Sequence, residues 1–313
     1  MHRNRDGGLT IMLKKLLIYP LVAVLAFVGA DIALCFVYPD VSALKSERFE
    51  KTAFMKYREQ QWEKQGLDRE ISWTWVPLRK VSPYLIKAVI IAEDDMFWRH
   101  EGFDFKAMQR ALEEDLRKKK LSAGGSTISQ QLAKNLYLSP AKTPLRKIKE
   151  AIYTWRLEKN LSKKRIVELY LNAAEWGDGI FGIQAASRHY YGKNAMALTA
   201  EEAAKLASVL PNPIRYNPTG GKRYVLARSR LIYRIMVKRG IVIPEFEEVM
   251  NAPDEPGEGD SGLGSQTDTT GVSAPAGEGQ GEGLEPLSLP ESTTGPSAPE
   301  NAGSAGEGEN PAP

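Results

Sequence analysis

A mainly α-helical fold with at most small β elements is predicted for this chain of 313 residues. Three observations support this class. Helix-start signals followed by apolar residues at helical spacing recur between residues 82 and 211. Strand-like alternation is sparse, and its best candidate, 72–75 with two tryptophans, fits either a short strand or an aromatic belt at a membrane interface. The region that carries these signals, about 40–250, has the length of one domain.

The first predicted helix is an apolar run at 16–37, long enough to cross a bilayer because 22 helical residues span about 33 Å. Asp31 is its only charge. Basic residues in 1–15 predict that the N-terminus is cytoplasmic and that everything after Tyr38 lies on the outer (periplasmic) face of the cytoplasmic membrane. A cleavable signal peptide is the alternative, since residues 28–30 resemble a small-residue cleavage site. In both cases the body of the protein is exported.

Within the body, N-cap residues predict five helix starts, at Ser82, Asp104, Thr143, Ser162 and Thr199. Proline follows the first and the third of them, at the first helical position. The helix after Ser82 delivers Glu93 at its far end, and the helix after Asp104 is expected over 105–116. Glu202 completes a capping box with Thr199, for a helix that stops at Pro211.

The C-terminal segment 251–313 is predicted to be a disordered acidic tail. It is rich in Gly, Pro and Ser, has no aromatic residue, and cannot bury enough apolar surface to offset its ordering entropy. A wall-spanning or partner-binding arm is the alternative. Because the tail holds 12 acidic and no basic residues, 1–250 carry a net charge of +15, against +3 for the chain. This positive charge indicates an anionic partner. Because the domain is expected to be exported, a membrane-linked phosphate is favoured over nucleic acid.

A first candidate motif, EDDMFWRHEGFD at 93–104, places three consecutive carboxylates at a helix end. Their mutual repulsion, together with apolar walls from nearby aromatic residues, is expected to raise the pKa of at least one of them. A carboxylate tuned in this way, such as Glu93, can take a proton from a sugar hydroxyl near neutral pH. His100 is expected to fix the loop by hydrogen bonds, with a role as proton shuttle as the alternative.

A second candidate motif, GGSTISQQLAKN at 124–135, combines a glycine turn with hydroxyls, amides and a cation at helical spacing. A glycine turn that enters a helix N-terminus is suited to bind an anion. The segment is not a nucleotide-binding P-loop, because no GK[ST] follows the glycines. A hinge followed by a polar helix is the alternative interpretation.

A third candidate is one face of the helix after Thr143. At about 100° per residue, Arg146, Lys147 and Glu150 share a face opposite a predicted buried face of Leu145, Ile148 and Ile152. The alternative is a solvated face with an ordinary Arg146–Glu150 salt bridge. The following charged stretch, 158–168, is expected to be solvated.

In order and spacing these segments resemble the peptidoglycan glycosyltransferases of glycosyltransferase family 51. The resemblance covers about 83–236 and includes RKIKEAIYTWRLEKNLSKKRIVELYLN, GIFGIQAASRHYYGKNAMALTAEEAAKLASVLPNP and NPTGGKRYVLARSRLIYRIM. It implies a lysozyme-like helical domain within 38–250, at the outer face of the cytoplasmic membrane. This domain would polymerise lipid II into β-1,4-linked glycan strands and release undecaprenyl diphosphate.

The resemblance also implies residue roles. Glu93 matches the catalytic base, and Glu150 matches the second essential carboxylate, which orders cations or a divalent metal, Mg²⁺ or Mn²⁺. The matching pyrophosphate-side cations are Lys134, Arg146 and Lys147. Donor-site or acceptor-site positions fall on Arg110, Ser126, Thr127, Gln130 and Gln131. Lys142 stands where some members have a phosphate-binding Arg, and a lysine there lacks bidentate reach.

A stand-alone enzyme without a transpeptidase domain is expected, because the tail begins by about Asn251. Two SxxK matches, at 42–45 and 139–142, lack a following KTG. Two other classes of function stay open: a lysozyme-like lytic enzyme with Glu93 as general acid, and a non-catalytic membrane scaffold. The expected partners are lipid II, the growing glycan strand, the membrane and other cell-wall synthesis or division proteins.

Overall fold

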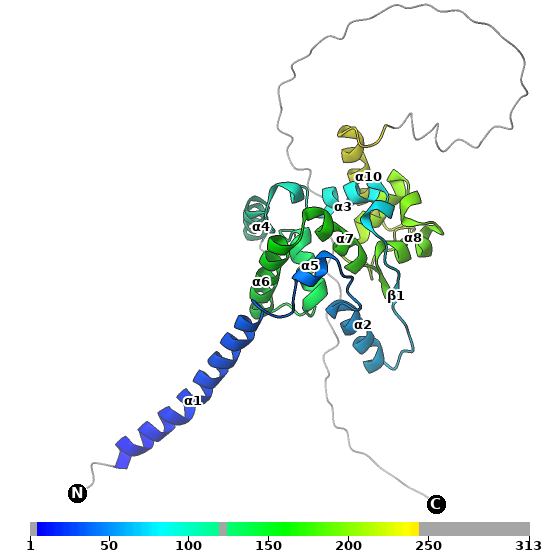
Figure 1. Cartoon of the computed structure of the whole chain (residues 1–313). Coiled ribbons are helices and arrows are strands. Elements are labelled where there is room, and N and C mark those ends of the chain that lie inside the picture. Colours follow the sequence, from blue (N-terminus) through cyan, green and yellow to red (C-terminus); the bar gives the residue numbers. More distant parts are fainter. Residues whose placement is uncertain (1–4, 119–123, 244–313) are drawn as a thin grey trace, which may run out of the picture. The chain divides into compact units, whose positions relative to one another are not determined.

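The computed structural model describes residues 5–118 and 124–243. Within these ranges the fold is mainly helical, with ten α-helices and three short strands (Figure 1), which confirms the predicted class. The predicted acidic tail, 251–313, lies outside the described residues.

The helices in chain order are α1 (Arg5–Leu34), α2 (Ala53–Lys64), α3 (Pro83–Glu93), α4 (Phe105–Lys118), α5 (Ile128–Tyr137), α6 (Pro144–Asn160), α7 (Lys163–Ala173), α8 (Ile183–Tyr191), α9 (Ala200–Val209) and α10 (Arg223–Lys238). The strands are β1 (Ser72–Trp73), β2 (Glu175–Gly177) and β3 (Ile180–Phe181). In the sheet, β3 lies between β1, to which it is parallel, and β2, to which it is antiparallel. The strand interpretation of 72–75 is thus confirmed for its first two residues.

Most predicted helix starts are confirmed with their caps. The hydroxyls of Thr143 and Ser162 each accept a hydrogen bond from the backbone N–H three residues on, at 3.2 Å. Thr199 and Glu202 form the predicted capping box of α9. Ser82 behaves differently, because its hydroxyl donates to the carbonyl of Leu198 at 2.8 Å instead of capping α3.

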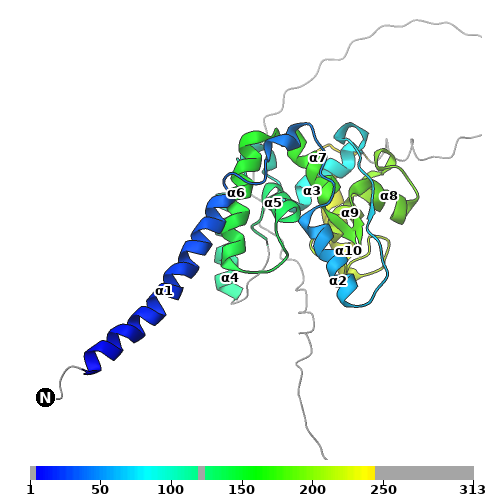
Figure 2. The same cartoon turned by 60° about the horizontal axis from the view of Figure 1, so that its bottom comes forward.

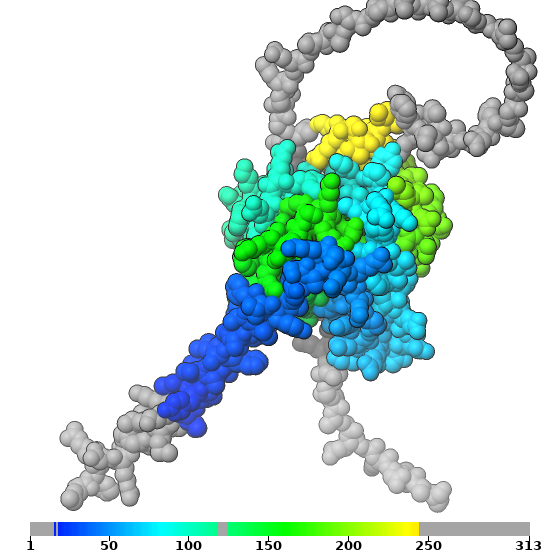
Figure 3. All heavy atoms as spheres, in the orientation of Figure 1, coloured from blue at the N-terminus to red at the C-terminus, as the bar shows by residue number. Residues whose placement is uncertain are grey.

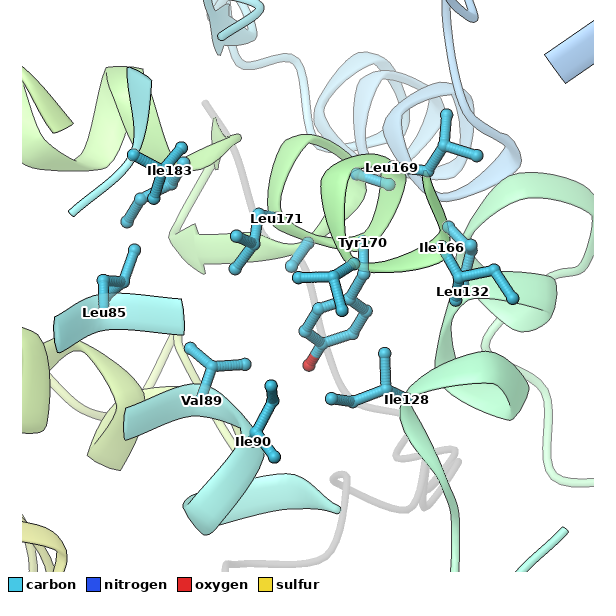
Figure 4. Close-up of a cluster of buried hydrophobic side chains, with 14 of the residues drawn as sticks. Leu85, Val89, Ile90, Ile128, Leu132, Ile166, Leu169, Tyr170, Leu171 and Ile183 are labelled. Atoms are coloured by element: carbon cyan, nitrogen blue, oxygen red, sulfur yellow. The ribbon is translucent and has the colours of Figure 1, made fainter. Parts of the chain in front are cut away.

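Two groups of helices build the core: α3 with α9 and α10, and α5 with α6 and α7 (Figure 2). One hydrophobic cluster joins them, in which Val89 and Ile90 of α3 lie toward Tyr170 of α7 and Ile128 of α5 (Figure 4). Each fully buried aliphatic side chain contributes about 1.5–3 kcal/mol to folding. The cluster therefore fixes the ends of α3 and α5 relative to each other, which matters for the site described below.

An arginine of α6 holds the segment after α1 against the helical domain by hydrogen bonds. Arg156 of α6 donates to the carbonyls of Cys35, Val37 and Pro39, at 2.6 to 3.1 Å. In the space-filling view, residues 35–50 (blue) lie over α6 and α7 (green) (Figure 3). Within 5–118 and 124–243, no helix combines the length and the apolar character needed to cross a bilayer. The transmembrane anchor at 16–37 stays a prediction.

The predicted buried face of α6 is wrong. Ile148 is 49% exposed, whereas Glu150, on the face expected to point outward, is 3% exposed. Periodicity alone assigns apolar residues to the interior, but here the inward face carries a polar site and Ile148 points out. The expectation of a solvated 158–168 is also wrong, because Ile166 is fully buried and Arg165 donates to the carbonyls of Leu44 and Glu47.

Asn172 is a fully buried residue whose amide holds the segment between β1 and α3. Its Oδ1 accepts from the N–H of Val76 at 2.9 Å, and its Nδ2 donates to the carbonyls of Val76 and Glu168, both at 2.8 Å. Asn172→Ala removes the partners of the Val76 N–H and carbonyl, so we expect the free energy of unfolding to fall by about 2–5 kcal/mol in urea titrations. Asn217→Ala, at an exposed asparagine, is the control and should change it by less than about 0.5 kcal/mol. Equal losses would contradict the assigned role of Asn172.

Candidate functional site

Glu93, the last residue of α3, has a nearly buried carboxylate with two partners from distant parts of the chain. Its side chain is 10% exposed. Oε2 accepts from Nε2 of Gln131 in α5 at 2.9 Å, and Oε1 lies 3.4 Å from Nη2 of Arg228 in α10. Burial raises the pKa of Glu93, and Arg228 and the bond from Gln131 oppose that rise without cancelling it. A carboxylate of this kind is suited to accept a proton.

The raised pKa was predicted, with two causes: enclosure by apolar walls, which agrees with the burial of Glu93, and repulsion between the three carboxylates, which is wrong. The neighbouring carboxylates do not crowd Glu93, because each has its own partner. Asp95 pairs with Arg239 at 2.5 and 2.8 Å. Asp94 bonds to His100 at 2.8 Å and accepts from the backbone N–H of Ile128 at 2.9 Å. Burial, and not repulsion within the motif, is the main cause.

His100 fixes the loop after α3, as the sequence predicted. Its Nδ1 accepts from the backbone N–H of Gly102 at 3.1 Å, so this nitrogen carries no proton and Nε2 is the donor to Asp94. Gly102 has φ +89°, and a Cβ there would lie 2.9 Å from the side chains of Thr154 and Glu158. Only glycine lets the loop lie this close to α6.

The start of α5 uses two predicted ligand residues as structural caps. Thr127 and Gln130 form a capping box, and the Thr127 hydroxyl donates to the carbonyl of Gly102 at 2.7 Å. Both side chains are 2% exposed, so their polar groups are engaged inside the protein. Gly125 lies against α4, where a Cβ would come within 3.3 Å of Met108 and Ala111. The glycine turn thus serves packing at this position.

The second carboxylate, Glu150 of α6, lies among cations. Both of its oxygens are bonded, one by Arg146 and the other by Lys147. The charges of both Glu150 and Glu93 act on Lys134 of α5, whose own pKa is lowered, chiefly by burial. The structure therefore brings Glu93, Gln131, Lys134, Arg146, Lys147 and Glu150 into one electrostatically coupled cluster.

Three predicted site residues lie at the surface. Arg110 on α4 is exposed and donates to the carbonyl of Lys106 at 3.3 Å. Ser126, just before α5, and Lys142, between α5 and α6, are also exposed. In the described ranges, no hydrogen bond or ion pair joins these three to Glu93 or Glu150.

Sequence reasoning missed two residues of the site, Arg228 and Tyr170. Arg228 lies in the segment 217–236 quoted for the family resemblance, which was the one available signal for it. Tyr170 lies on α7, and its hydroxyl donates to Oε1 of Gln131 at 3.0 Å. Among the described side chains, Nε of Arg228 and Nε of Arg146 are buried donors without a hydrogen-bond partner. One such unused donor lies beside each carboxylate, where a bound ligand can accept from it.

The residues around Glu150 do not fit a metal site built from protein ligands. Both of its oxygens already bind cationic side chains, and a metal would have to displace them. No group of three His, Cys, Asp or Glu side chains in 5–118 and 124–243 is arranged to hold a metal ion. The Mg²⁺ or Mn²⁺ ion implied by the resemblance stays a prediction, and no reaction step below depends on it.

The site thus combines a nearly buried carboxylate of raised pKa, Glu93, with three cations, Lys134, Arg146 and Lys147, that interact with the second carboxylate, Glu150. This arrangement suits a group transfer in which a hydroxyl loses its proton while an anionic leaving group departs.

Comparisons with known proteins agree with this chemistry. Residues 59–237 match the family model described as Transglycosylase. A biosynthetic peptidoglycan transglycosylase of Nitrosospira multiformis is 46% identical over 190 residues, which cover 61% of this chain and 83% of that protein. Proteins of the same name from Laribacter hongkongensis (46% over 185 residues, 59% and 81% covered) and Aromatoleum aromaticum (50% over 186 residues, 58% and 81% covered) are similar in the same way.

Because the Thr127 hydroxyl caps α5 and ties it to Gly102, we expect Thr127→Val to lower the free energy of unfolding by about 1–2 kcal/mol. Ser126→Ala removes a hydroxyl from the adjacent, exposed residue and should leave stability unchanged. Chemical denaturation of both variants checks this. A Thr127→Val protein as stable as the wild type would show that the cap is dispensable.

Proposed function

Because the chain belongs to the transglycosylase family, we propose that it polymerises lipid II into the β-1,4-linked glycan strands of peptidoglycan. The observation that carries the proposal is the buried carboxylate of Glu93, with its raised pKa, in one electrostatic cluster with three cations. A lipid-linked diphosphate donor needs both parts, a base for the acceptor and positive charge for the leaving group.

In the proposed reaction, the 4-hydroxyl of the acceptor's N-acetylglucosamine attacks the anomeric carbon of the donor. A bond forms between this oxygen and the anomeric carbon, and the bond from that carbon to the phosphate oxygen breaks. The hydroxyl proton passes to Glu93, and the bonding electrons leave with undecaprenyl diphosphate. Lys134, Arg146 and Lys147 bind the diphosphate, and Glu150 holds the last two of these cations in place.

A lytic, lysozyme-like activity is the second candidate, since a raised pKa also suits a general acid. The cations argue against it, because cleavage of a glycan releases no phosphate. Polymer formed from labelled lipid II by the purified chain supports the proposal, whereas loss of turbidity of isolated cell walls without polymer formation contradicts it.

We also propose that the chain acts at the outer face of the cytoplasmic membrane, held by the apolar segment 16–37. The apolar side chains of α1 support this, because they are largely exposed in the protein alone, among them Leu16, Leu21, Leu25 and Phe27. A second apolar stripe lies at helical spacing on α4, formed by Phe105, Met108, Leu112 and Leu116. Other cell-wall synthesis or division proteins stay predicted partners.

Glu93→Gln keeps the size of the side chain and removes the base. We expect polymerisation to fall by about 100-fold or more, while the protein stays folded and still binds the donor. Asp95→Asn is the matched control, since Asp95 is two residues away, half exposed and paired with Arg239. The control should polymerise lipid II at a near wild-type rate. Wild-type activity of Glu93→Gln would overturn the assignment of the base.

Lys134→Ala removes a cation that interacts electrostatically with both Glu93 and Glu150. We expect the affinity for phosphoglycolipid inhibitors of the moenomycin type to fall about 10- to 100-fold, because their phosphate loses a charged partner. Lys87→Ala, at an exposed lysine of α3, is the control. Calorimetric titration measures both, and unchanged affinity of Lys134→Ala would refute the phosphate role.

A further inference from the structure

Tyr170 is a buried tyrosine that neither the sequence motifs nor the proposed reaction assigns a role. Its side chain is almost fully enclosed, and its hydroxyl reaches from α7 to the gap between Ile90 of α3 and Ile128 of α5 (Figure 4). There it donates to Oε1 of Gln131 at 3.0 Å. The same amide donates through Nε2 to Glu93 at 2.9 Å. A chain of two hydrogen bonds thus leads from the core to the proton acceptor.

A glutamine amide has a donor end and an acceptor end of nearly equal shape, so its orientation depends on its partners. With Nε2 toward Glu93, Gln131 favours the ionised carboxylate and lowers the pKa of Glu93. With Oε1 toward Glu93, the amide would instead accept a bond from the protonated acid and favour that form. The orientation of Gln131 therefore decides which state of the base is stabilised.

The hydroxyl of Tyr170 selects the first orientation. Burial, together with the charges of Glu93 and Asp94, raises the pKa of Tyr170 well above its ordinary value, so the phenol keeps its proton and can donate to Oε1. An amide turned the other way would lose this bond inside the core, where an unpaired polar atom is costly.

We propose that Tyr170 is a positioning residue for the base: through Gln131 it keeps Glu93 ionised and aimed before the acceptor hydroxyl loses its proton. This inference rests on the proposed function, since Glu93 is the base of that reaction. The other groups that act on Glu93 are Arg228 of α10 and Lys134 of α5, and Tyr224 of α10 lies in its field. None of them is altered when the Tyr170 hydroxyl is removed.

The test is the rate of lipid II polymerisation by Tyr170→Phe over a range of pH. Without the hydroxyl, the amide can turn and accept from the protonated Glu93. The acidic limb of the kcat/KM profile should then move to higher pH by about 0.5–1 unit. Activity relative to wild type should therefore be about 3- to 10-fold lower at the acidic end of the range than at the plateau. KM should not change, because Tyr170 lies behind Gln131 and touches no substrate.

Two controls separate positioning from packing. Tyr190→Phe removes a partly buried hydroxyl that lies 3.3 Å from the carbonyl of Trp176, and it should leave the pH profile unchanged. Gln131→Ala removes the donor to Glu93 and should also move the acidic limb to higher pH, and adding Tyr170→Phe to it should cause no further shift.

The inference would be overturned if the acidic limb fell at the same pH in wild type and Tyr170→Phe. It would also be overturned if Tyr170→Phe caused the same shift in the Gln131→Ala background as in the wild type. An unmoved acidic limb in Gln131→Ala would overturn it as well, even if Tyr170→Phe fails to fold. A wild-type chain that forms no polymer from lipid II would instead contradict the proposed function.

Discussion

The buried carboxylate of Asp94 is the link on which the geometry of the site depends. One oxygen accepts the backbone N–H of Ile128 at the first residue of α5, and the other bonds to His100, which in turn fixes the loop toward α6. Glu93 directly precedes Asp94, and Gln131 lies one turn into α5. The bond between the end of α3 and the start of α5 therefore sets the distance between the base and the amide that orients it. Because the Asp94 side chain is 1% exposed, loss of either partner would leave a buried polar atom without its hydrogen bond, which is costly.

Two nearly buried carboxylates acquire different chemistry from their surroundings. Glu93 has one neutral donor at 2.9 Å and one cation at 3.4 Å, and these do not offset the loss of hydration, so its pKa is raised. Glu150 has a cation on each oxygen, from the positions three and four residues before it on the same helix. Glu93 can therefore gain a proton, while Glu150 holds the side chains of Arg146 and Lys147 in place. The arrangement around Glu150 could be predicted from sequence spacing, because its two cations lie within about one helical turn of it.

What the sequence predicted correctly is mostly local or covered by the family resemblance. The caps of α6, α7 and α9 depend on residues three positions apart, and the motif order identified the family, which the comparisons confirm. The inward face of α6 was mispredicted, since counting apolar residues cannot reveal that a charged site lies inside the fold. Arg228 and Tyr170 were missed because they lie 135 and 39 residues from their partners, and only packing brings them together.

The position of Lys134 couples the two halves of the proposed reaction. Both carboxylates attract its charge, and burial already disfavours that charge. When Glu93 takes the acceptor's proton, one of the two attractions on Lys134 disappears, while new negative charge develops on the departing diphosphate. A cation that loses one anionic partner inside a poorly hydrated site gains more from binding another. Proton transfer at Glu93 and stabilisation of the leaving group thus favour each other.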